Sequence, residues 1–136
     1  MPSRLGPGGP QLGPEIAVNG DFTSDSGWNL GAGWQISAGF LFRNESGGSS
    51  SALQSSAALS AGALYRIRFT VSGVSGSDNR LLVRIYGGAT VNGAIMTGDG
   101  VYQQDIVAPA SPAGYGIFAV GGFAGLIDNF SIRRVL

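Results

Sequence analysis

The side chains that enzymes use most often for nucleophilic and acid–base chemistry are missing from this sequence. Its 136 residues include no histidine, cysteine or lysine, and every basic residue is an arginine. Serine–histidine and cysteine–histidine pairs, Schiff bases and thiolate or imidazole zinc sites are therefore excluded. The 8 carboxylates could in principle form a glycosidase pair. Because most of them lie in turn sequences, where aspartate commonly accepts backbone hydrogen bonds, we expect a protein that is not an enzyme.

Two of the carboxylates lie in more specific sequence contexts. Asp21 belongs to the string NGDF, and Asp128 belongs to IDNFSI near the C-terminus. Strand alternation puts Asp128 on the side of Phe130 and Ile132, the expected core face, where a carboxylate needs a partner. One interpretation is a structural calcium ion held by Asp21, Asp128 and backbone carbonyls, with no other cofactor required. The other is that Asp128 accepts N–H groups of the N-terminal turn and joins the first strand to the last.

Aromatic side chains are the other residues that could contact a ligand. Trp28 and Trp34 flank a glycine-containing turn, and we expect both to fill the core. Tyr86 is expected to point outwards beside Arg68 and Arg84. It is the best aromatic candidate for contact with an external ligand such as a sugar ring.

The elements that position these residues are strands, because apolar residues recur with a period of two. Residues 65–71 and 81–85 alternate in this way, and a turn-rich segment lies between them. We expect the two to form a hairpin in which Val71 faces Val83 and Phe69 faces Ile85. Further strands are expected over residues 40–44, 52–59, 89–96, 101–108, 115–120 and 126–135. This pattern predicts an all-β fold, a two-sheet antiparallel β-sandwich of the jelly-roll type with an extended N-terminal arm.

The chain divides into a short arm and one domain. Residues 1–15 contain four prolines and four glycines, so we expect an extended arm, and residues 16–136 are expected to form the sandwich. The arm either folds back along its own domain or docks on another chain. Docking on another protein is the hypothesis that we carry forward.

Composition bears on the partners of the protein. The formal net charge is zero, only 12% of residues are charged, and the isoelectric point is near 6.1. Such a balance gives no general attraction to nucleic acid or to an anionic membrane, so neither is an expected partner. A surface with few charges suits a protein that packs against other proteins, and an alanine and glycine codon bias of a GC-rich genome is the equal alternative. A homo-oligomer is a further expectation.

The two terminal motifs also carry a family resemblance. The string NGDFTSDSGWNLGAGWQISAGFLFRN and the closing GLIDNFSIRRV resemble those of carbohydrate-binding-module-like jelly rolls, over residues 16–135. Such domains occur in secreted glycan-binding modules and in virion proteins of tailed bacteriophages. The resemblance implies that the two motifs lie on neighbouring strands, and that a structural Ca²⁺ can lie near them, which points to Asp21 and Asp128. The exposed aromatic row of the family's sugar sites has no clear match here.

The resemblance and the arm together lead to a functional hypothesis. Residues 1–14 lack the apolar region of a signal peptide, which favours synthesis in the host cytoplasm and residence in a virion. We expect a structural protein, a capsid decoration or head-spike protein on the capsid exterior, anchored to the major capsid protein through residues 1–15. The alternatives are a carbohydrate-binding module for a host-surface glycan and a tail or baseplate component.

Overall fold

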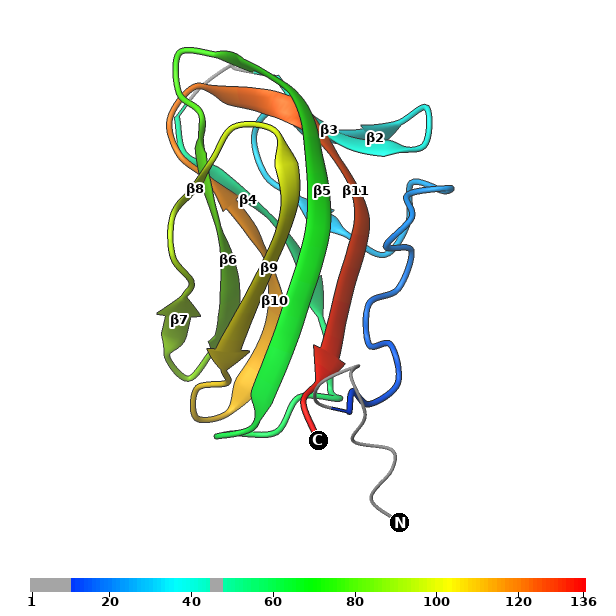
Figure 1. The fold of residues 1–136 in the computed structure, drawn as a ribbon, viewed down its shortest axis with the longest axis vertical. Coiled ribbons are helices and arrows are strands. Elements are labelled where there is room, and N and C mark those ends of the chain that lie inside the picture. Colours follow the sequence, from blue (N-terminus) through cyan, green and yellow to red (C-terminus); the bar gives the residue numbers. More distant parts are fainter. Residues whose placement is uncertain (1–10, 45–47) are drawn as a thin grey trace.

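The protein forms a sandwich of two antiparallel β-sheets in a computed structural model that describes residues 11–44 and 48–136 (Figure 1). Every regular element within those residues is a strand. The described part of the chain therefore contains no helix that could cross a membrane. The all-β jelly-roll sandwich expected from the sequence is confirmed.

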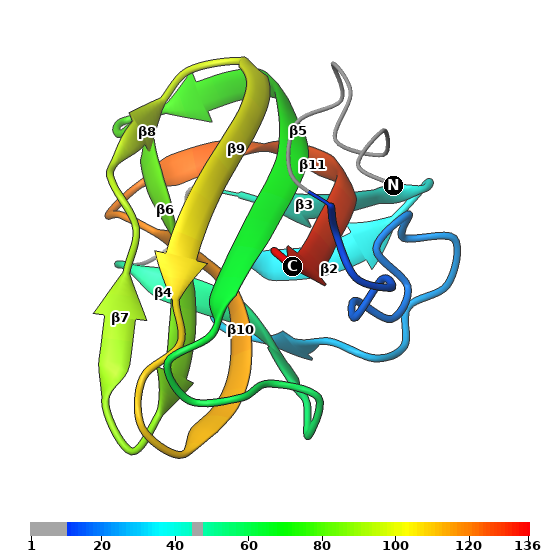
Figure 2. The ribbon, with the colours of Figure 1, turned by 60° about the horizontal axis from the view of Figure 1, so that its bottom comes forward.

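One sheet has five strands in the order β2-β3-β11-β5-β9. Their bounds are β2 Trp34–Ser37, β3 Phe40–Arg43, β5 Leu64–Gly76, β9 Gly100–Val107 and β11 Phe123–Arg134. The long strands β5 and β11 form its centre, and β9 is the edge strand beside β5. Figure 2 shows this sheet curving across the front of the molecule.

The second sheet has six strands in the order β1-β4-β10-β6-β7, and β8 also pairs with β6. Their bounds are β1 Asn29–Leu30, β4 Ser50–Ser55, β6 Arg80–Gly87, β7 Thr90–Asn92, β8 Met96–Thr97 and β10 Pro112–Ala119. Glycines at the centre of β10 allow close packing on this sheet. A Cβ on Gly116 would lie 2.0 Å from the carbonyl oxygen of Ala52.

The core lies between the sheets and is rich in aromatic rings. Phe130 of β11 is central to it, with ring centroids 5.1 Å from Trp28, 5.9 Å from Tyr115 and 6.1 Å from Phe69. Trp28 is 8% exposed and Trp34 is 6% exposed, which confirms the prediction that both tryptophans are core residues. The core thus ties the NGDF-to-tryptophan segment to the closing motif on β11.

The predicted hairpin between residues 65–71 and 81–85 is wrong. β5 pairs with β9 and β11 in the five-stranded sheet, whereas β6 pairs with β10, β7 and β8 in the other. Val71, Phe69, Val83 and Ile85 are all buried, so the inward face of each strand was assigned correctly. The two strands face each other across the core instead of pairing edge to edge. A period of two identifies a buried face, and that face is the same for both arrangements.

The N-terminal segment lies along the outside of β11 (Figure 1). Leu12 pairs with Val135, the Gly13 N–H donates to the Arg134 carbonyl at 2.8 Å, and the Ile16 N–H donates to that of Ile132 at 3.0 Å. Residues 11–15 of the predicted arm therefore pack on their own domain. Residues 1–10 lie outside the described residues, and anchoring to another protein stays a prediction.

Candidate functional site: a groove on the five-stranded sheet

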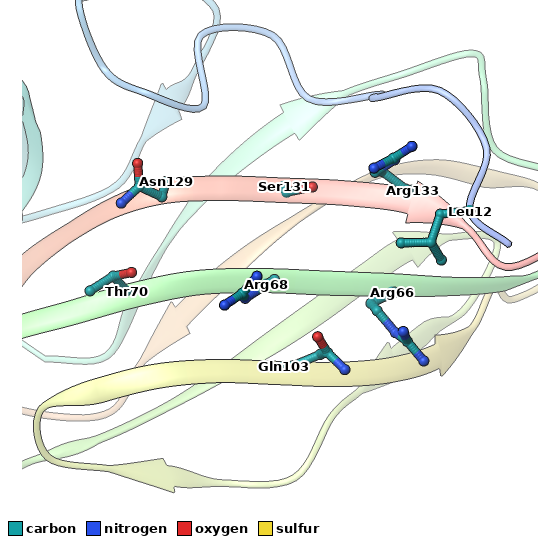
Figure 3. A pocket seen from close by; sticks show the side chains of 8 residues that line it. All are labelled: Leu12, Arg66, Arg68, Thr70, Gln103, Asn129, Ser131 and Arg133. Carbon is teal, nitrogen blue, oxygen red and sulfur yellow. The ribbon is translucent and has the colours of Figure 1, made fainter. Parts of the chain in front are cut away.

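A groove of about 390 Å³ lies on the outer face of the five-stranded sheet. It runs over β11, β5 and β9, whose side chains point out of the sheet towards the viewer in Figure 3. Its lining consists of Leu12, Arg66, Arg68, Thr70, Gln103, Asn129, Ser131 and Arg133. Seven of these eight side chains can form hydrogen bonds, so the groove is polar.

Strand register explains why these residues come together. Arg68 lies opposite Gln103 on β9 and opposite Ser131 on β11. Arg66, two residues along β5, lies opposite Asp105 and opposite Arg133 in the same way. Because alternate residues of neighbouring strands share a face, the register produces two polar rows across the sheet. Leu12 from the N-terminal segment closes one end (Figure 3).

The arginines at the Leu12 end of the groove are held by neighbouring acceptors. Arg66 donates Nε to Asp105 Oδ1 at 2.8 Å and Nη2 to Asp105 Oδ2 at 3.1 Å. These hydrogen bonds, together with the charge of Arg66, hold the pKa of Asp105 below its ordinary value. Arg133 donates Nε to the Gly13 carbonyl at 2.6 Å. Both guanidinium groups are thereby fixed in place at the groove wall.

Arg68, at the centre of the groove, is different. Its side chain is exposed, and it forms no hydrogen bond or ion pair within residues 11–44 and 48–136. Gln103, its neighbour on β9, is also exposed. The groove therefore presents a free guanidinium and a free amide beside each other.

Asp128 does not lie on the core face, so that prediction from alternation is wrong. A bulge in β11 between Asp128 and Ser131 inserts one residue relative to β5, and Asn129 takes a positive φ of 54°. Ile127 and Phe130 both face the core as a result, and Asp128 is half-buried on the outer face. Its Oδ1 accepts the N–H of Asn129 at 2.8 Å. The carboxylate thus supports the bulge.

Asp21 lies exposed in the loop that follows Gly20. Its Oδ1 accepts the backbone N–H of Thr23 at 3.4 Å and the Thr23 hydroxyl at 3.3 Å. In the described ranges, no three Asp, Glu, His or Cys side chains gather as a metal-binding group. The side chains of Asp21 and Asp128 thus fit local capping roles better than an ion-binding set, and the calcium site stays a prediction.

Joining the first segment to the last strand, the alternative role considered for Asp128, is carried out by Glu15. Glu15 Oε1 accepts the Ser131 hydroxyl at 2.5 Å, and Oε2 accepts the N–H of Ile132 at 2.8 Å. The Phe130 N–H donates to the Gly20 carbonyl at 2.8 Å, so the two terminal motifs lie side by side as the resemblance implied. Nothing in the spacing of Glu15 marked it for this role, because its partners lie more than a hundred residues away.

Tyr86 lies half-buried on the outer face of the six-stranded sheet, next to Arg84. A Cβ on Gly114 would be 2.4 Å from its hydroxyl oxygen, so the Tyr86 side chain covers that glycine. Arg84 stacks with its Cζ 4.4 Å from the Phe118 ring centroid. Arg68 belongs to the other sheet, so the expected grouping of Tyr86 with Arg68 is wrong. Sequence reasoning placed all three outwards but assigned them to one hairpin.

The groove was not predictable from the sequence. Its residues come from four separate segments, and their juxtaposition depends on β5 pairing with β9 and β11. The available signal was the polar alternation Gln103-x-Asp105 beside Arg66-x-Arg68. It becomes informative only when those two strands are known to be neighbours.

The solved structures that this fold matches include carbohydrate-binding modules. The N-terminal cellulose-binding domain of Cellulomonas fimi β-1,4-glucanase C matches with a TM-score of 0.57 and 20% identity, over 89% of this chain and 97% of that one. The CBM22-1 xylan-binding domain from Paenibacillus barcinonensis gives 0.59 and 15%, over 93% and 96%. A mutant family 29 carbohydrate-binding module complexed with mannohexaose gives 0.57 and 11%, over 92% of each chain. At these identities the match establishes the fold.

Comparison by sequence alone gives no match to a known family or protein. No protein-family profile matches this chain, and no curated protein matches it. The similarity is therefore carried by the three-dimensional arrangement of the strands.

Proposed function

We propose that this protein is a non-enzymatic carbohydrate-binding module whose sugar site is the groove on the five-stranded sheet. The observation that carries the proposal is the groove itself, a hollow of about 390 Å³ lined almost wholly by hydrogen-bonding side chains. Its volume lies within the ordinary range for small-ligand sites, about 300–1,000 Å³. The jelly-roll fold shared with cellulose-binding and xylan-binding domains supports the same function.

The groove favours recognition through hydrogen bonds over recognition through stacking. No aromatic side chain lines it, and within the described residues no aromatic side chain is among the exposed large apolar ones. A sugar in this groove would meet the amides of Gln103 and Asn129 and the hydroxyls of Thr70 and Ser131. The two amides and the Thr70 hydroxyl can pair with sugar hydroxyls as both donors and acceptors, whereas the Ser131 hydroxyl, which donates to Glu15, remains available as an acceptor.

Glycan binding at this site is tested with one substitution inside the groove and one outside it. Gln103→Ala removes an exposed amide from the groove, and Gln35→Ala removes an exposed amide from β2 of the same sheet. In isothermal titration against the best ligand of a glycan array, Gln103→Ala should weaken binding about 5–10-fold, the value of one hydrogen bond. Gln35→Ala should leave the affinity unchanged.

A third variant identifies the face that binds. Tyr86→Ala changes the outer face of the six-stranded sheet and should not affect a ligand in the groove. Loss of binding in Tyr86→Ala but not in Gln103→Ala would place the sugar on the opposite sheet and refute the groove as the site. A broad array of neutral and acidic glycans without any binding would refute the proposed function.

The virion role and the virion location expected from the sequence are compatible with glycan binding. A displayed jelly roll on a particle could bind a host-surface sugar through the groove. No described contact bears on a capsid, tail or baseplate partner or on a homo-oligomer, and these stay predictions. Glycan binding is the function that the geometry supports best.

A further inference from the structure

We infer that the groove is selective for an anionic glycan, one whose sugars carry carboxylate or sulfate groups, and that Arg68 binds the anionic group. This inference rests on the proposed function and specifies its ligand class. It starts from the balance of donors and acceptors in the groove, which a neutral sugar does not match.

The lining of the groove is rich in hydrogen-bond donors. Three of its eight side chains are arginines, each with five N–H donors and no acceptor. No aspartate or glutamate is among the lining residues. The two hydroxyls and two amides offer donors and acceptors together, so the excess of donors comes from the guanidinium groups. A ligand that balances this excess must supply acceptors, which carboxylate and sulfate oxygens do.

The donors of the three arginines are not equally engaged. Arg66 uses Nε and Nη2 on Asp105, and Arg133 uses Nε on the Gly13 carbonyl. Arg68 lies in the next row of the sheet, opposite Gln103 and Ser131, and forms no hydrogen bond or ion pair with any described residue. An exposed guanidinium with its planar set of N–H groups free can bind a carboxylate or sulfate in a bidentate manner.

The carboxylates around the groove are already engaged by the protein. Asp105 accepts two hydrogen bonds from Arg66. Glu15 accepts hydrogen bonds from the Ser131 hydroxyl and from the N–H groups of Ile132 and Ala17. Asp128, which lies opposite Thr70 at the far end of the groove, accepts from Asn129. Their negative charges reduce the field of the arginines, but none of the three forms an ion pair with Arg68.

The inference predicts discrimination between charged and uncharged forms of one polymer. Polygalacturonate and its fully methyl-esterified form share a backbone and differ in the carboxylate, and dextran sulfate and dextran differ in the sulfate. Polymannuronate and glucuronoxylan extend the acidic set. Affinity electrophoresis or titration at low salt should show binding to at least one acidic polymer, about tenfold weaker binding to its neutral counterpart, and loss of affinity as salt is added.

Arg68→Gln and Arg134→Gln separate a specific contact from general charge attraction. Each variant removes one positive charge from an exposed side chain, but Arg134 does not line the groove. Arg68→Gln should weaken binding of the acidic polymer about tenfold, whereas Arg134→Gln should change it less than about twofold. The ratio of affinities for polygalacturonate and dextran sulfate then tells whether the favoured anion is a carboxylate or a sulfate.

The possible failures are distinguishable. Equal binding of charged and neutral forms, binding of neutral glycans alone, or equal losses in the two arginine variants would overturn the inference and leave the proposed function standing. Absence of binding to every polymer, charged and neutral, would overturn both. Circular dichroism spectra and thermal unfolding midpoints equal to those of the unsubstituted protein would show that both variants are folded, so that a change in affinity reports on binding.

Discussion

At the scale of single residues, the two terminal motifs are built for folding. Asn19 forms the first turn, with its Nδ2 donating to the carbonyls of Ser24 at 2.7 Å and Ser26 at 2.9 Å. Its own carbonyl accepts the indole N–H of Trp28 at 3.2 Å. Phe22 then enters the core beside Trp28, with ring centroids 5.5 Å apart. These contacts give Asn19 and Phe22 of the NGDF motif structural roles that require no ligand.

Gly20 has the tightest steric requirement in this motif. A Cβ at Gly20 would lie 2.1 Å from the carbonyl oxygen of Phe130, a backbone atom that cannot rotate away. Gly20→Ala should therefore lower the free energy of unfolding by about 2–4 kcal/mol, because the loop must separate from β11. Urea denaturation measures this change. The control is Gly48→Ala, where the added Cβ meets open space; equal stabilities of the two variants would contradict the close approach.

At the scale of elements, the bulge in β11 decides which residues reach the groove. Asn129 takes the extra position at a φ of 54°, a left-handed conformation that asparagine tolerates better than most residues. Its side chain thereby joins the groove, and Ser131 and Arg133 follow on the same face. The bulge thus allows one strand to supply core residues and three groove residues.

A matched pair of substitutions distinguishes the contribution of Asn129 to the stability of the bulge from its contribution to glycan binding. Both Asn129→Val and Asn129→Gly remove the amide, but valine in a left-handed conformation should cost about 1–2 kcal/mol and glycine less. Thermal or urea unfolding measures the difference between the two. Glycan affinity should fall in both variants if the amide contacts the sugar. Equal unfolding midpoints would show that position 129 does not need a positive φ.

The strands also show which features of the fold were predictable from the sequence alone. The polar and apolar alternation within β5, β6 and β9 was enough to assign their faces and the fold class, because burial of one face is a local property. It could not decide that β5 pairs with β9 and β11, since partner choice depends on long-range packing of the whole sandwich. Strands β1 and β2, of two and four residues, were too short for a period to be read. Phe130 and Ile132 face the core as predicted, but Asp128 was assigned to the wrong face because alternation does not reveal the bulge that separates it from them.

At the scale of the whole molecule, the N-terminal segment connects the two sheets. Glu15 is hydrogen-bonded to β11 of the five-stranded sheet. Three residues later, the Val18 N–H donates to Gln54 Oε1 of β4 in the six-stranded sheet at 3.0 Å, and Gln54 Nε2 donates to the Val18 carbonyl at 2.5 Å. The buried Tyr115 hydroxyl also donates to Gln54 Oε1. The segment therefore closes one side of the sandwich and is part of the domain.

Two truncations test this structural role against the anchoring role predicted for residues 1–15. Deletion of residues 1–10 leaves the segment from Gln11 to Glu15 in place, and it serves as the reference for the longer deletion. Deletion of residues 1–15 removes the Leu12–Val135 pairing, the Gly13 hydrogen bonds and both Glu15 contacts with β11. Those losses should lower the free energy of unfolding by about 4–5 kcal/mol, at roughly 1 kcal/mol for each hydrogen bond.

The same two truncations also test whether the N-terminal segment contributes to glycan binding in the groove. Without Leu12 and Gly13 the groove loses its end wall and Arg133 loses the acceptor of its Nε, so deletion of residues 1–15 should weaken glycan binding as well. Urea unfolding and titration measure the two effects on the same samples. If both truncations kept full stability and affinity, the segment from Gln11 to Glu15 would be free to serve as an anchor. If only the longer deletion impairs both properties, any anchor must be sought in residues 1–10, because the rest of the predicted arm is engaged by its own domain.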